Sequence, residues 1–374
     1  MTKERKTYHC QQCEKEIYYE GLCWLCRAKQ KRKDGLAMTN EDVAYKQKYV
    51  ISHLDELDKF EDPAYSYFWD CLSYQNVVSE ELQQAALDRK MYIPAELYCY
   101  APEHIRDELI NRLNQCTNRL EGSYLMSCLA MQGDDMSLEA LYQIKKEGRP
   151  WLEDLYAEPE IYAYSGNWSF DENGKRFETG YSKCYEIDDD KDNDNTDKAV
   201  ITAKVREEKC PHCGSSLIEP ISIDCDDERF SFIGAKGRIR AVCCPGCVGF
   251  TESAFSSYFD DGTASADLPY EGVADYGFCT EEQDLKEAEE KGAKLRLREV
   301  PPFFGAEDWE AATIGGFAHW IQDVQILNCP CCQKPMKYLA QLPWDNFLNG
   351  MCEGTLYIEI CTNCKKFGMV HQQT

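Results

Sequence analysis

The chain has 374 residues, 43% hydrophobic and 12% aromatic, a composition that excludes a disordered chain and favours two or three globular domains. No stretch approaches the length of a membrane span, about 18 consecutive apolar residues, and the first residues lack the apolar segment of a secretory signal. The net charge of −25 disfavours nucleic acid and anionic lipid as partners and favours basic proteins, although solubility alone is an equal explanation.

Residues 1–35 are predicted to form a small zinc ribbon with a basic tail. Its two Cys-x-x-Cys pairs are Cys10/Cys13 and Cys23/Cys26. The nine residues between the pairs leave room for a tight hairpin only, and a unit this small needs metal to fold. Residues 1–33 hold nine Lys or Arg and four Asp or Glu, so this segment carries +5 and the remaining chain −30.

Residues 36–150 are predicted to be helical. Thr39 and Asp42 have the spacing of a helix-capping pair. Apolar residues at helical spacing continue from Val43 to Phe60, and Pro63 is expected to stop this run.

A second clear helix is expected to open at Pro102 and to end at Gly122, because apolar residues recur every three or four positions between them. Shorter helices follow, one beginning at Tyr124 and one from Leu138 to Ile144. Short helices joined by brief turns predict a stack of helical hairpins.

Residues 151–199 are predicted to form an aromatic cap, β-rich or irregular, that ends in an acidic linker. Asp171–Gly174 is typical of a hairpin turn. The run Asp188–Asn195 is interpreted as an exposed loop. A calcium loop is the alternative, but the Gly and the terminal Glu of an EF-hand loop are missing.

Residues 200–374 are predicted to form a β-rich domain with two zinc ribbons. The cysteine pairs are Cys210/Cys213 with Cys244/Cys247, and Cys329/Cys332 with Cys361/Cys364. In each ribbon a strand-like segment, Arg238–Val242 or Thr355–Ile360, leads into the second pair. The two ribbons are offset by 119 and 117 residues, which suggests two halves of one domain, and Glu281–Lys294 between them reads as an exposed charged helix. The whole chain is therefore predicted to be α+β, with an N-terminal zinc ribbon, an α-helical hairpin region and this C-terminal domain.

The three couples of cysteine pairs, with spacers of 9, 30 and 28 residues, predict three four-cysteine zinc sites. Each Cys-x-x-Cys pair directs two thiolates toward one metal ion. Their sulfur atoms are then about 3.7 Å apart, which is the length of one edge of a tetrahedron of sulfur atoms around zinc. Four thiolates close the coordination shell, so we interpret the zinc as structural rather than catalytic. Zinc-type spacing without a secretory signal also predicts a reducing, cytoplasmic location.

Ten further cysteines have no assigned role. They are Cys71, Cys99, Cys116, Cys128, Cys184, Cys225, Cys243, Cys279, Cys331 and Cys352. Several lie on apolar helical faces, where a thiol acts as a small hydrophobe. Cys243 and Cys331 are adjacent to the predicted ligands Cys244 and Cys332. A ligand assignment shifted by one residue, to Cys243 or Cys331, is therefore the alternative.

Catalytic motifs are absent from the sequence: there is no phosphate-binding loop, no dinucleotide fingerprint, no zinc-protease motif and no nucleophile elbow. This absence lowers the case for an enzyme, and no catalytic residue is predicted. Of the six histidines, His212 lies inside a cysteine pair and fits a structural loop, and His319 has no partner that would make it a base.

The C-terminal residues carry a resemblance. The residues in question are Gly315–Asp323 (GGFAHWIQD), Cys329–Cys332, Pro335-Met336, Gln341, Gly354–Tyr357, Cys361–Cys364 and Gln372. Their order resembles the YwqG-like family of bacterial proteins, well over residues 315–374 and more loosely from Val200. The resemblance brings no catalytic residues, and some proteins of this type resemble immunity proteins encoded beside polymorphic toxins.

The glycine pair Gly315–Gly316 is expected to allow a tight turn or a close backbone approach. Trp320 and Gln322 are expected on one face of an extended segment, with Ile321 on the other. We interpret Trp320 as a core residue rather than a ligand-stacking one.

Three functions fit these observations. The first is a cytoplasmic protein-binding protein, in particular an immunity protein for a cognate bacterial toxin domain with a basic surface, of nuclease or ADP-ribosyltransferase type. The second is a nucleic-acid-associated factor that uses Trp24 and the basic run Arg27–Lys33. The third is an enzyme with an unrecognised site near Gly315–Asp323.

Overall fold

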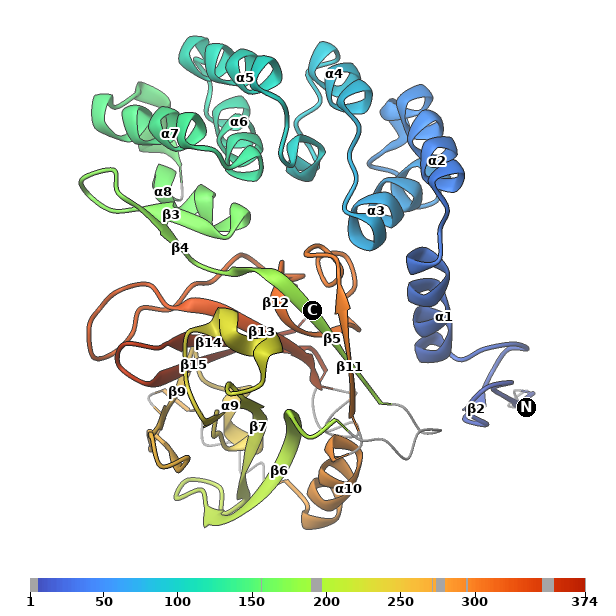
Figure 1. Ribbon diagram of the computed structural model, residues 1–374, viewed down its shortest axis with the longest axis vertical. Helices are drawn as coiled ribbons and strands as arrows, with labels where there is room; N and C mark the ends of the chain where they lie inside the picture. The colour runs from blue at the N-terminus through green and yellow to red at the C-terminus, as the bar shows by residue number, and fades with distance from the viewer. Residues whose placement is uncertain are drawn as a thin grey trace, which may run out of the picture. The chain divides into compact units, whose positions relative to one another are not determined.

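The computed structural model describes residues 6–155, 157–189, 197–270, 272–273, 280–293, 295–344 and 353–373. The chain divides into two compact units, residues 1–77 and 78–374. The predicted α+β class is confirmed, since helices dominate the first part and strands the C-terminal part (Figure 1). None of the helices in the described ranges combines the length and the apolar character needed to cross a bilayer.

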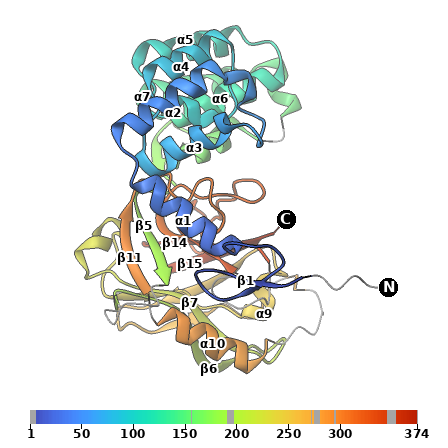
Figure 2. The same ribbon diagram turned by 90° about the vertical axis from the view of Figure 1, so that its right-hand side faces the viewer.

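The first unit has a small hairpin followed by helices. Its elements are β1 (Tyr8–His9), β2 (Glu16–Ile17), α1 (Trp24–Leu36), α2 (Asn40–Ser52), η1 (Leu54–Glu56) and α3 (Pro63–Gln75). Figure 2 shows α1 leaving the cysteine-bearing loops and leading to α2 and α3. The predicted capping pair is confirmed, because the Thr39 hydroxyl accepts from the Asp42 amide while the Asp42 carboxylate accepts from the Thr39 amide.

Close packing joins α1 to α3 within this unit. A Cβ on Gly35 would lie only 2.1 Å from Cδ2 of Tyr74, so only glycine allows this approach. The Gln75 side chain also donates to the Gly35 carbonyl oxygen at 2.7 Å. These contacts fasten α1, which contains Cys26 and is capped by Cys23, to the other helices of the unit.

The prediction for Val43 to Phe60 was wrong in two respects. Helix α2 ends at Ser52, and Phe60 is 77% exposed in the connection to α3. Pro63 does not stop a helix but begins α3, with Asp62 as its N-cap. An acidic N-cap followed by proline is a start signal, and it also marks the helix α3 that the periodicity alone did not reveal.

The second unit begins with an array of helices. They are α4 (Glu80–Asp88), η2 (Ala95–Tyr98), α5 (Glu103–Gln115), α6 (Arg119–Gln132), α7 (Asp135–Glu147), η3 (Pro150–Asp154), α8 (Pro159–Tyr162) and η4 (Ala163–Gly166). Helices α5, α6 and α7 pack on one another, as the predicted hairpin stack requires. Helix α4 had no prediction, although Ser79 is its N-cap and accepts from the Leu82 amide.

The predicted helix from Pro102 to Gly122 is two helices. Helix α5 stops at Gln115, and the Asn118 side chain caps α6 by accepting from the Glu121 amide at 2.9 Å. Gly122 does not end a helix, contrary to the prediction, but lies near the start of α6. It packs against the ring of Trp151, and a Cβ at this position would come within 2.6 Å of that ring. The glycine is there for packing, and the helix boundary is set by the asparagine cap.

The predicted aromatic cap is mixed in structure, with η3, α8 and η4 followed by a hairpin. Strands β3 (Trp168–Phe170) and β4 (Arg176–Glu178) pair on either side of the turn Asp171–Gly174, so the predicted hairpin is confirmed. Strand β5 (Tyr181–Asp189) follows and belongs to the large sheet. This sheet therefore starts before residue 200, within the segment that the sequence assigns to the cap and linker.

An eight-stranded antiparallel sheet forms the main part of the second unit. Its order is β10 (Ala264–Ala266), β9 (Ala254–Tyr258), β15 (Lys366–Gln372), β14 (Thr355–Cys361), β13 (Lys337–Pro343), β12 (Ala312–Gly316), β5 and β11 (Leu295–Val300). Of the predicted linker Asp188–Asn195, the first residues extend β5, and those from 190 onward lie outside the described residues.

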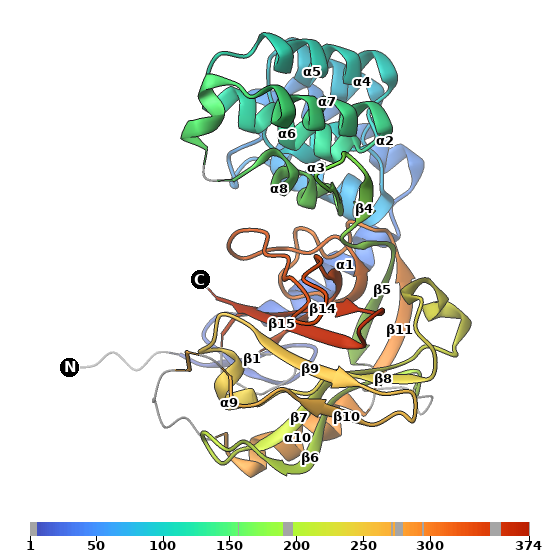
Figure 3. The same cartoon turned by 90° about the vertical axis from the view of Figure 1, so that its left-hand side faces the viewer.

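A second, three-stranded sheet carries the middle cysteine pairs. It consists of β6 (Val200–Lys209), β7 (Ser216–Asp224) and β8 (Arg238–Arg240), with η5 (Glu228–Ile233) between the last two and α9 (Pro245–Val248) after them. Figure 3 shows this sheet with α10 (Glu282–Gly292) beside β6. The helix predicted near Glu281–Lys294 is thus present, but Leu285 and Ala288 on one face are buried. A single hydrophobic core includes side chains of both sheets, which fits the expectation of one domain.

Candidate metal centres and the anchored loop

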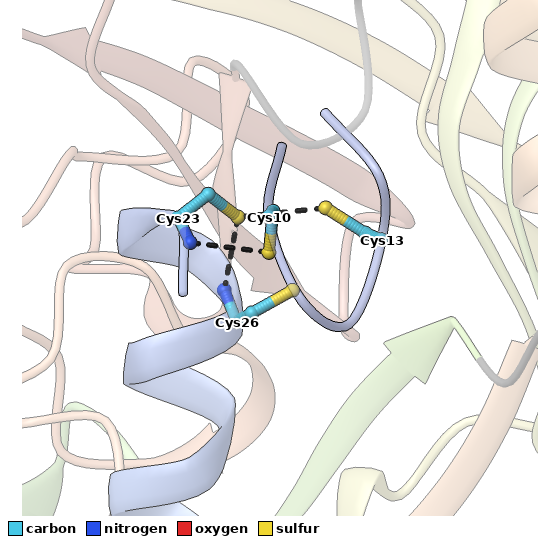
Figure 4. Close-up of side chains that lie close together, drawn as sticks. All are labelled: Cys10, Cys13, Cys23 and Cys26. Carbon is cyan, nitrogen blue, oxygen red and sulfur yellow. Dashed lines mark hydrogen bonds between the residues drawn. The ribbon is translucent and has the colours of Figure 1, made fainter. Parts of the chain in front are cut away.

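The first four-cysteine group joins a hairpin to a helix start. Cys10 and Cys13 lie in the turn between β1 and β2, while Cys23 is the N-cap of α1 and Cys26 lies in its first turn. Figure 4 shows the four thiols converging, and Cys13 Sγ lies 3.6 Å from Cys23 Sγ. The surrounding core is minimal, with Ile17 the only non-cysteine residue among its buried members, so the thiols themselves are most of what this module buries.

Backbone amides act on this group. The Cys23 amide donates to Cys10 Sγ at 3.2 Å, which lowers the pKa of Cys10 to about 6. Burial and then the neighbouring thiols raise the pKa of Cys26. One thiol ionises easily and another resists, so a bound cation is needed to hold all four as thiolates.

The second group lies at one end of the three-stranded sheet. Cys210 and Cys213 occupy the turn between β6 and β7, and Cys244 and Cys247 bracket the start of α9. Cys213 Sγ is 3.4 Å from Cys244 Sγ, and Cys210 Sγ is 3.8 Å from Cys247 Sγ. Burial opposes ionisation of Cys213, but hydrogen bonds with Ser215 lower its pKa to about 7.

The third group lies at the ends of central strands of the large sheet. Cys329 and Cys332 precede β13, Cys361 is the last residue of β14, and Cys364 is in the turn between β14 and β15. Cys332 Sγ is 3.9 Å from Cys361 Sγ. Burial opposes ionisation of Cys329, yet backbone amides of the following residues lower its pKa to about 7.

The geometry of all three groups fits a tetrahedral metal ion. Within each group the four sulfur atoms lie within 4.8 Å of one another. Tetrahedral zinc with Zn–S bonds of about 2.3 Å requires sulfur atoms about 3.8 Å apart, which is the range of the measured pairs. Every described cysteine is a free thiol, so none of the twelve is consumed by a disulfide. The structure therefore brings together the three sets of four residues that the sequence named.

The alternative assignments by one residue do not match the structure. Cys244 and Cys332, not Cys243 and Cys331, belong to the groups. Cys243 is buried and exchanges backbone hydrogen bonds with Ile218, whereas Cys331 is exposed. Of the other unassigned cysteines, those in the described ranges are buried, and Cys279 and Cys352 lie outside them.

The glycine pair of the C-terminal motif makes the predicted close approach. Gly315 and Gly316 have φ of +74° and +73°. A Cβ on Gly315 would lie 2.0 Å from the Lys183 carbonyl oxygen, and one on Gly316 would lie 2.4 Å from that of Pro302. Both the backbone conformation and the space exclude any other residue. The pair ends β12 and starts the segment 317–327.

Segment 317–327 forms a bent loop rather than the extended segment expected from the sequence; we call it the motif loop. Side chains from the large sheet accept hydrogen bonds from backbone amides of the motif loop. The amide of His319 donates to Gln341 Oε1 at 2.9 Å, that of Ile321 to the Tyr357 hydroxyl at 3.1 Å, and that of Gln322 to Gln372 Oε1 at 3.0 Å. The motif residues therefore act as anchors for a loop.

A buried glutamate completes this anchoring and was not identified from the sequence. Glu359 on β14 has no exposed surface, and its Oε2 accepts the Leu327 amide at 2.9 Å. Burial raises its pKa well above the usual range, with the Leu327 hydrogen bond opposing. The signal in the sequence was its place two residues after Tyr357 in an alternating strand, which puts both on one face.

The aromatic and histidine residues of the motif loop also have structural partners. The ring of Trp320 stacks on that of Tyr357 with 4.3 Å between centroids, in keeping with its interpretation as a packing residue. His319 contacts the Ala306 carbonyl oxygen through Nδ1 at 3.0 Å. His212 is exposed in the turn of its cysteine pair. These partners give no catalytic arrangement among the described residues of the loop.

Taken together, the chain is an α+β protein with three tetracysteine groups that can each hold a metal ion. No family model matches it, and no solved structure matches it. It is similar to a protein of Salmonella typhimurium (strain LT2) described as "Uncharacterized protein YpfL", with 28% identity over 287 residues. The match covers 73% of this chain and 64% of that protein, so the chain spans less than two thirds of its relative's length.

Proposed function

We propose that the chain is a cytoplasmic protein-binding scaffold with three structural Zn²⁺ ions, and that it serves as an immunity protein that binds and neutralises a cognate bacterial toxin domain of nuclease or ADP-ribosyltransferase type. The observation that carries the proposal is the net charge of −25. A surface of this charge attracts basic proteins and accelerates their association, which is what an inhibitor of a nucleic-acid-cutting or nucleotide-using toxin needs.

The donor sets support zinc in a structural role. Thiolate is a soft ligand that selects zinc among the common divalent ions of the cytoplasm, and four of them leave no coordination position for water or substrate. When bound, zinc supplies a cross-link between two parts of the chain. The chain's own contribution is to hold the four sulfur atoms at the distances given above.

The resemblance of residues 315–374 to the YwqG-like family supports the bacterial immunity context. The motif residues Gly315, Gly316, Gln341 and Tyr357 serve loop anchoring in this chain, so they support a rigid binding surface more readily than a reaction.

The test is co-expression with the product of the adjacent gene. We expect the two proteins to co-purify at a 1:1 ratio, with a dissociation constant well below micromolar and an association rate that falls as salt rises. The product should also lose its toxicity in cells that make this chain. A neighbouring gene product that shows no interaction at micromolar concentration would remove the proposal.

A second candidate function is nucleic-acid association through the first unit. Tyr18, Tyr19 and Trp24 are 63%, 41% and 38% exposed beside the basic helix α1, and such a combination can stack bases and bind phosphates. Of its basic residues, Arg32 is buried and does not add to that surface. A salt-dependent shift of a labelled single-stranded oligonucleotide, lost when Lys29, Lys31 and Lys33 are changed to Glu, would favour this function over the first.

A further inference from the structure

The connection between α2 and α3 in the first unit places exposed aromatic rings beside a run of carboxylates. We call this surface the aromatic–acidic face. Its rings are Tyr45, Tyr49, Phe60, Tyr65 and Tyr67, and its carboxylates are Glu56, Asp58, Glu61 and Asp62. All of these residues lie within 23 positions of one another, so the face is built by one helical hairpin.

The rings form two contacting sets. In the first, Tyr67 on α3 meets Tyr49 and Tyr45 on α2 edge to face, with centroids 5.2 and 6.2 Å apart. In the second, Phe60 meets Tyr65 edge to face at 4.7 Å. Edge-to-face contacts fix the orientation of each ring, so the rings are already ordered before any partner arrives. The stacked ring of His53 covers one face of Tyr49, and Lys46 covers one face of Tyr67.

Two of these rings are highly exposed, and the other three are half-buried. Phe60 is 77% exposed and Tyr45 is 63% exposed. Isolated exposed apolar residues are ordinary, but several contacting rings within one hairpin form a patch of the kind that marks an interaction site. Aromatic residues are also the side chains that contribute most to protein–protein interfaces.

The connection that carries Phe60 is negatively charged. Residues 53–62 contain five Asp or Glu and a single Lys, and that Lys59 is paired with Glu56. Burial first, and then the negative charge of Asp62, raises the pKa of Tyr49. A partner that covers these rings therefore gains from positive charge and loses from negative charge.

The chain contains its own example of the contact that a basic partner would make. Lys46 Nζ lies 4.6 Å from the centroid of the Tyr67 ring and 2.5 Å from Asp70 Oδ2. One ammonium group is thus held by a ring face and a carboxylate together. At Phe60 a ring and a carboxylate are likewise close together, because the exposed Glu61 is the next residue in the chain.

We propose that the aromatic–acidic face binds an arginine- or lysine-rich segment of a protein partner, with its cationic side chains on the exposed Tyr45 and Phe60 rings and paired with Asp58 and Glu61. The inference rests on the proposed function in that it gives the recognised partner a basic segment. It adds where on this chain that segment binds.

The test uses the full chain and a fluorescently labelled nona-arginine peptide, followed by anisotropy. We expect saturable binding that the double variant Tyr45→Ser, Phe60→Ser weakens about fivefold or more, because each exposed cation–π contact is worth roughly a half to one kcal/mol. The matched control is Phe259→Ser, which removes a ring that is 48% exposed in the second unit and should leave binding unchanged. Unfolding curves and metal content of each variant establish that the fold is kept.

Charge is tested separately because an acidic protein attracts nona-arginine everywhere. Asp58→Lys with Glu61→Lys should weaken binding more than Glu139→Lys with Glu290→Lys, which changes the net charge equally at exposed positions elsewhere. Equal losses from the two pairs, or unchanged binding by the ring variant, would overturn the inference.

Hydrogen exchange of the unmodified chain gives a readout that does not depend on any variant. Added peptide should protect amides of residues 45–67, and protection elsewhere without these residues would contradict the assignment. A cognate toxin that binds the ring variant as tightly as the unmodified chain would leave the protein-binding function in place and remove this face from it.

Discussion

The ring of Trp320 in the motif loop stacks on the ring of Tyr357 in β14, with 4.3 Å between centroids and 21° between their planes. The same tyrosine uses its hydroxyl to accept from the Ile321 amide and to donate to the His319 carbonyl oxygen. One residue of the sheet therefore holds three consecutive residues of the loop, through its ring and its hydroxyl together.

Replacing Tyr357 with Phe should separate these two roles. The stacking on Trp320 remains, but two partly buried backbone groups of the loop lose their partner, and we expect a loss of about 1–3 kcal/mol in the free energy of unfolding. Chemical denaturation measures this loss. The control is Tyr338→Phe, because the Tyr338 hydroxyl is also buried but lies against Thr313 of β12 and accepts no hydrogen bond from the backbone amides of the motif loop, which lies wholly within the described residues. Equal destabilisation by the two changes would contradict the anchoring role.

Gly316→Ala should destabilise the protein beyond the cost of its backbone conformation. The matched control is Gly234→Ala, since Gly234 has φ of +77° but no atom within 4 Å of the place that a Cβ would take, whereas a Cβ at Gly316 meets the Pro302 carbonyl oxygen at 2.4 Å. The control should cost about 1–2 kcal/mol, and the Gly316 change about 1–3 kcal/mol more. Thermal unfolding of both variants in parallel checks the difference.

Glu359→Gln should change how stability depends on pH. Burial raises the folded-state pKa of Glu359, so between its unfolded and folded pKa values the folded chain holds more protons than the unfolded one, and stability falls as pH rises. Glutamine keeps an acceptor for the Leu327 amide without a titrating group. We expect the variant to be more stable than the unmodified chain at pH 8, with the advantage shrinking toward pH 4. Parallel denaturation curves across this range test it, and a constant difference would be the contrary result.

The metal stoichiometry should follow the four-cysteine groups. Purified protein should contain three zinc ions by elemental analysis, Cys332→Ser should reduce this to two, and the adjacent Cys331→Ser should leave it at three. The control removes a thiol one position away from Cys332 that is exposed and does not belong to the four-cysteine group. Loss of a zinc ion from both variants would show that the third group is assigned wrongly.

Chelation should act most strongly on the first unit's ribbon. Its buried cluster has Ile17 and three cysteines, which is too little apolar surface to fold without metal. We expect a chelator to abolish hydrogen-exchange protection over residues 8–26 while β13 and β14 keep theirs longer. Protection of 8–26 that survives complete metal removal would show that this ribbon folds by itself.

The sequence predicted the parts of the structure that rest on local chemistry. The cysteine pairs, the capping pair at Thr39, the hairpin at Asp171–Gly174 and the strand before Cys361 all depend on residues close together in the chain. It missed the break at Cys116 because the apolar spacing continues across it, and only the Asn118 cap marks the boundary. Side-chain periodicity reports which face is buried, whereas a helix end depends on which backbone groups find a partner.

The motif loop was the hardest feature to predict. Its anchors Gln341, Tyr357, Glu359 and Gln372 lie on three strands, and a polar residue on a buried strand gives no sign of what it will bind. Only the sheet order, which brings β13, β14 and β15 side by side, shows that these side chains all bind the motif loop. Resemblance identified several of these residues without giving their task.

Strand β14 carries Tyr357 and Glu359 and ends at Cys361, and the motif loop that they hold runs directly into Cys329 of the same four-cysteine group. The loop and the strand are therefore joined in two ways. Hydrogen bonds join them along their length, and at one end both contribute cysteines to the same four-cysteine group. A metal ion bound there would fix the C-terminal end of the loop at Cys329, so that only the stretch between Gly316 and Cys329 could move. Metal occupancy at the end of β14 would in this way govern how firmly the surface around Trp320 is held.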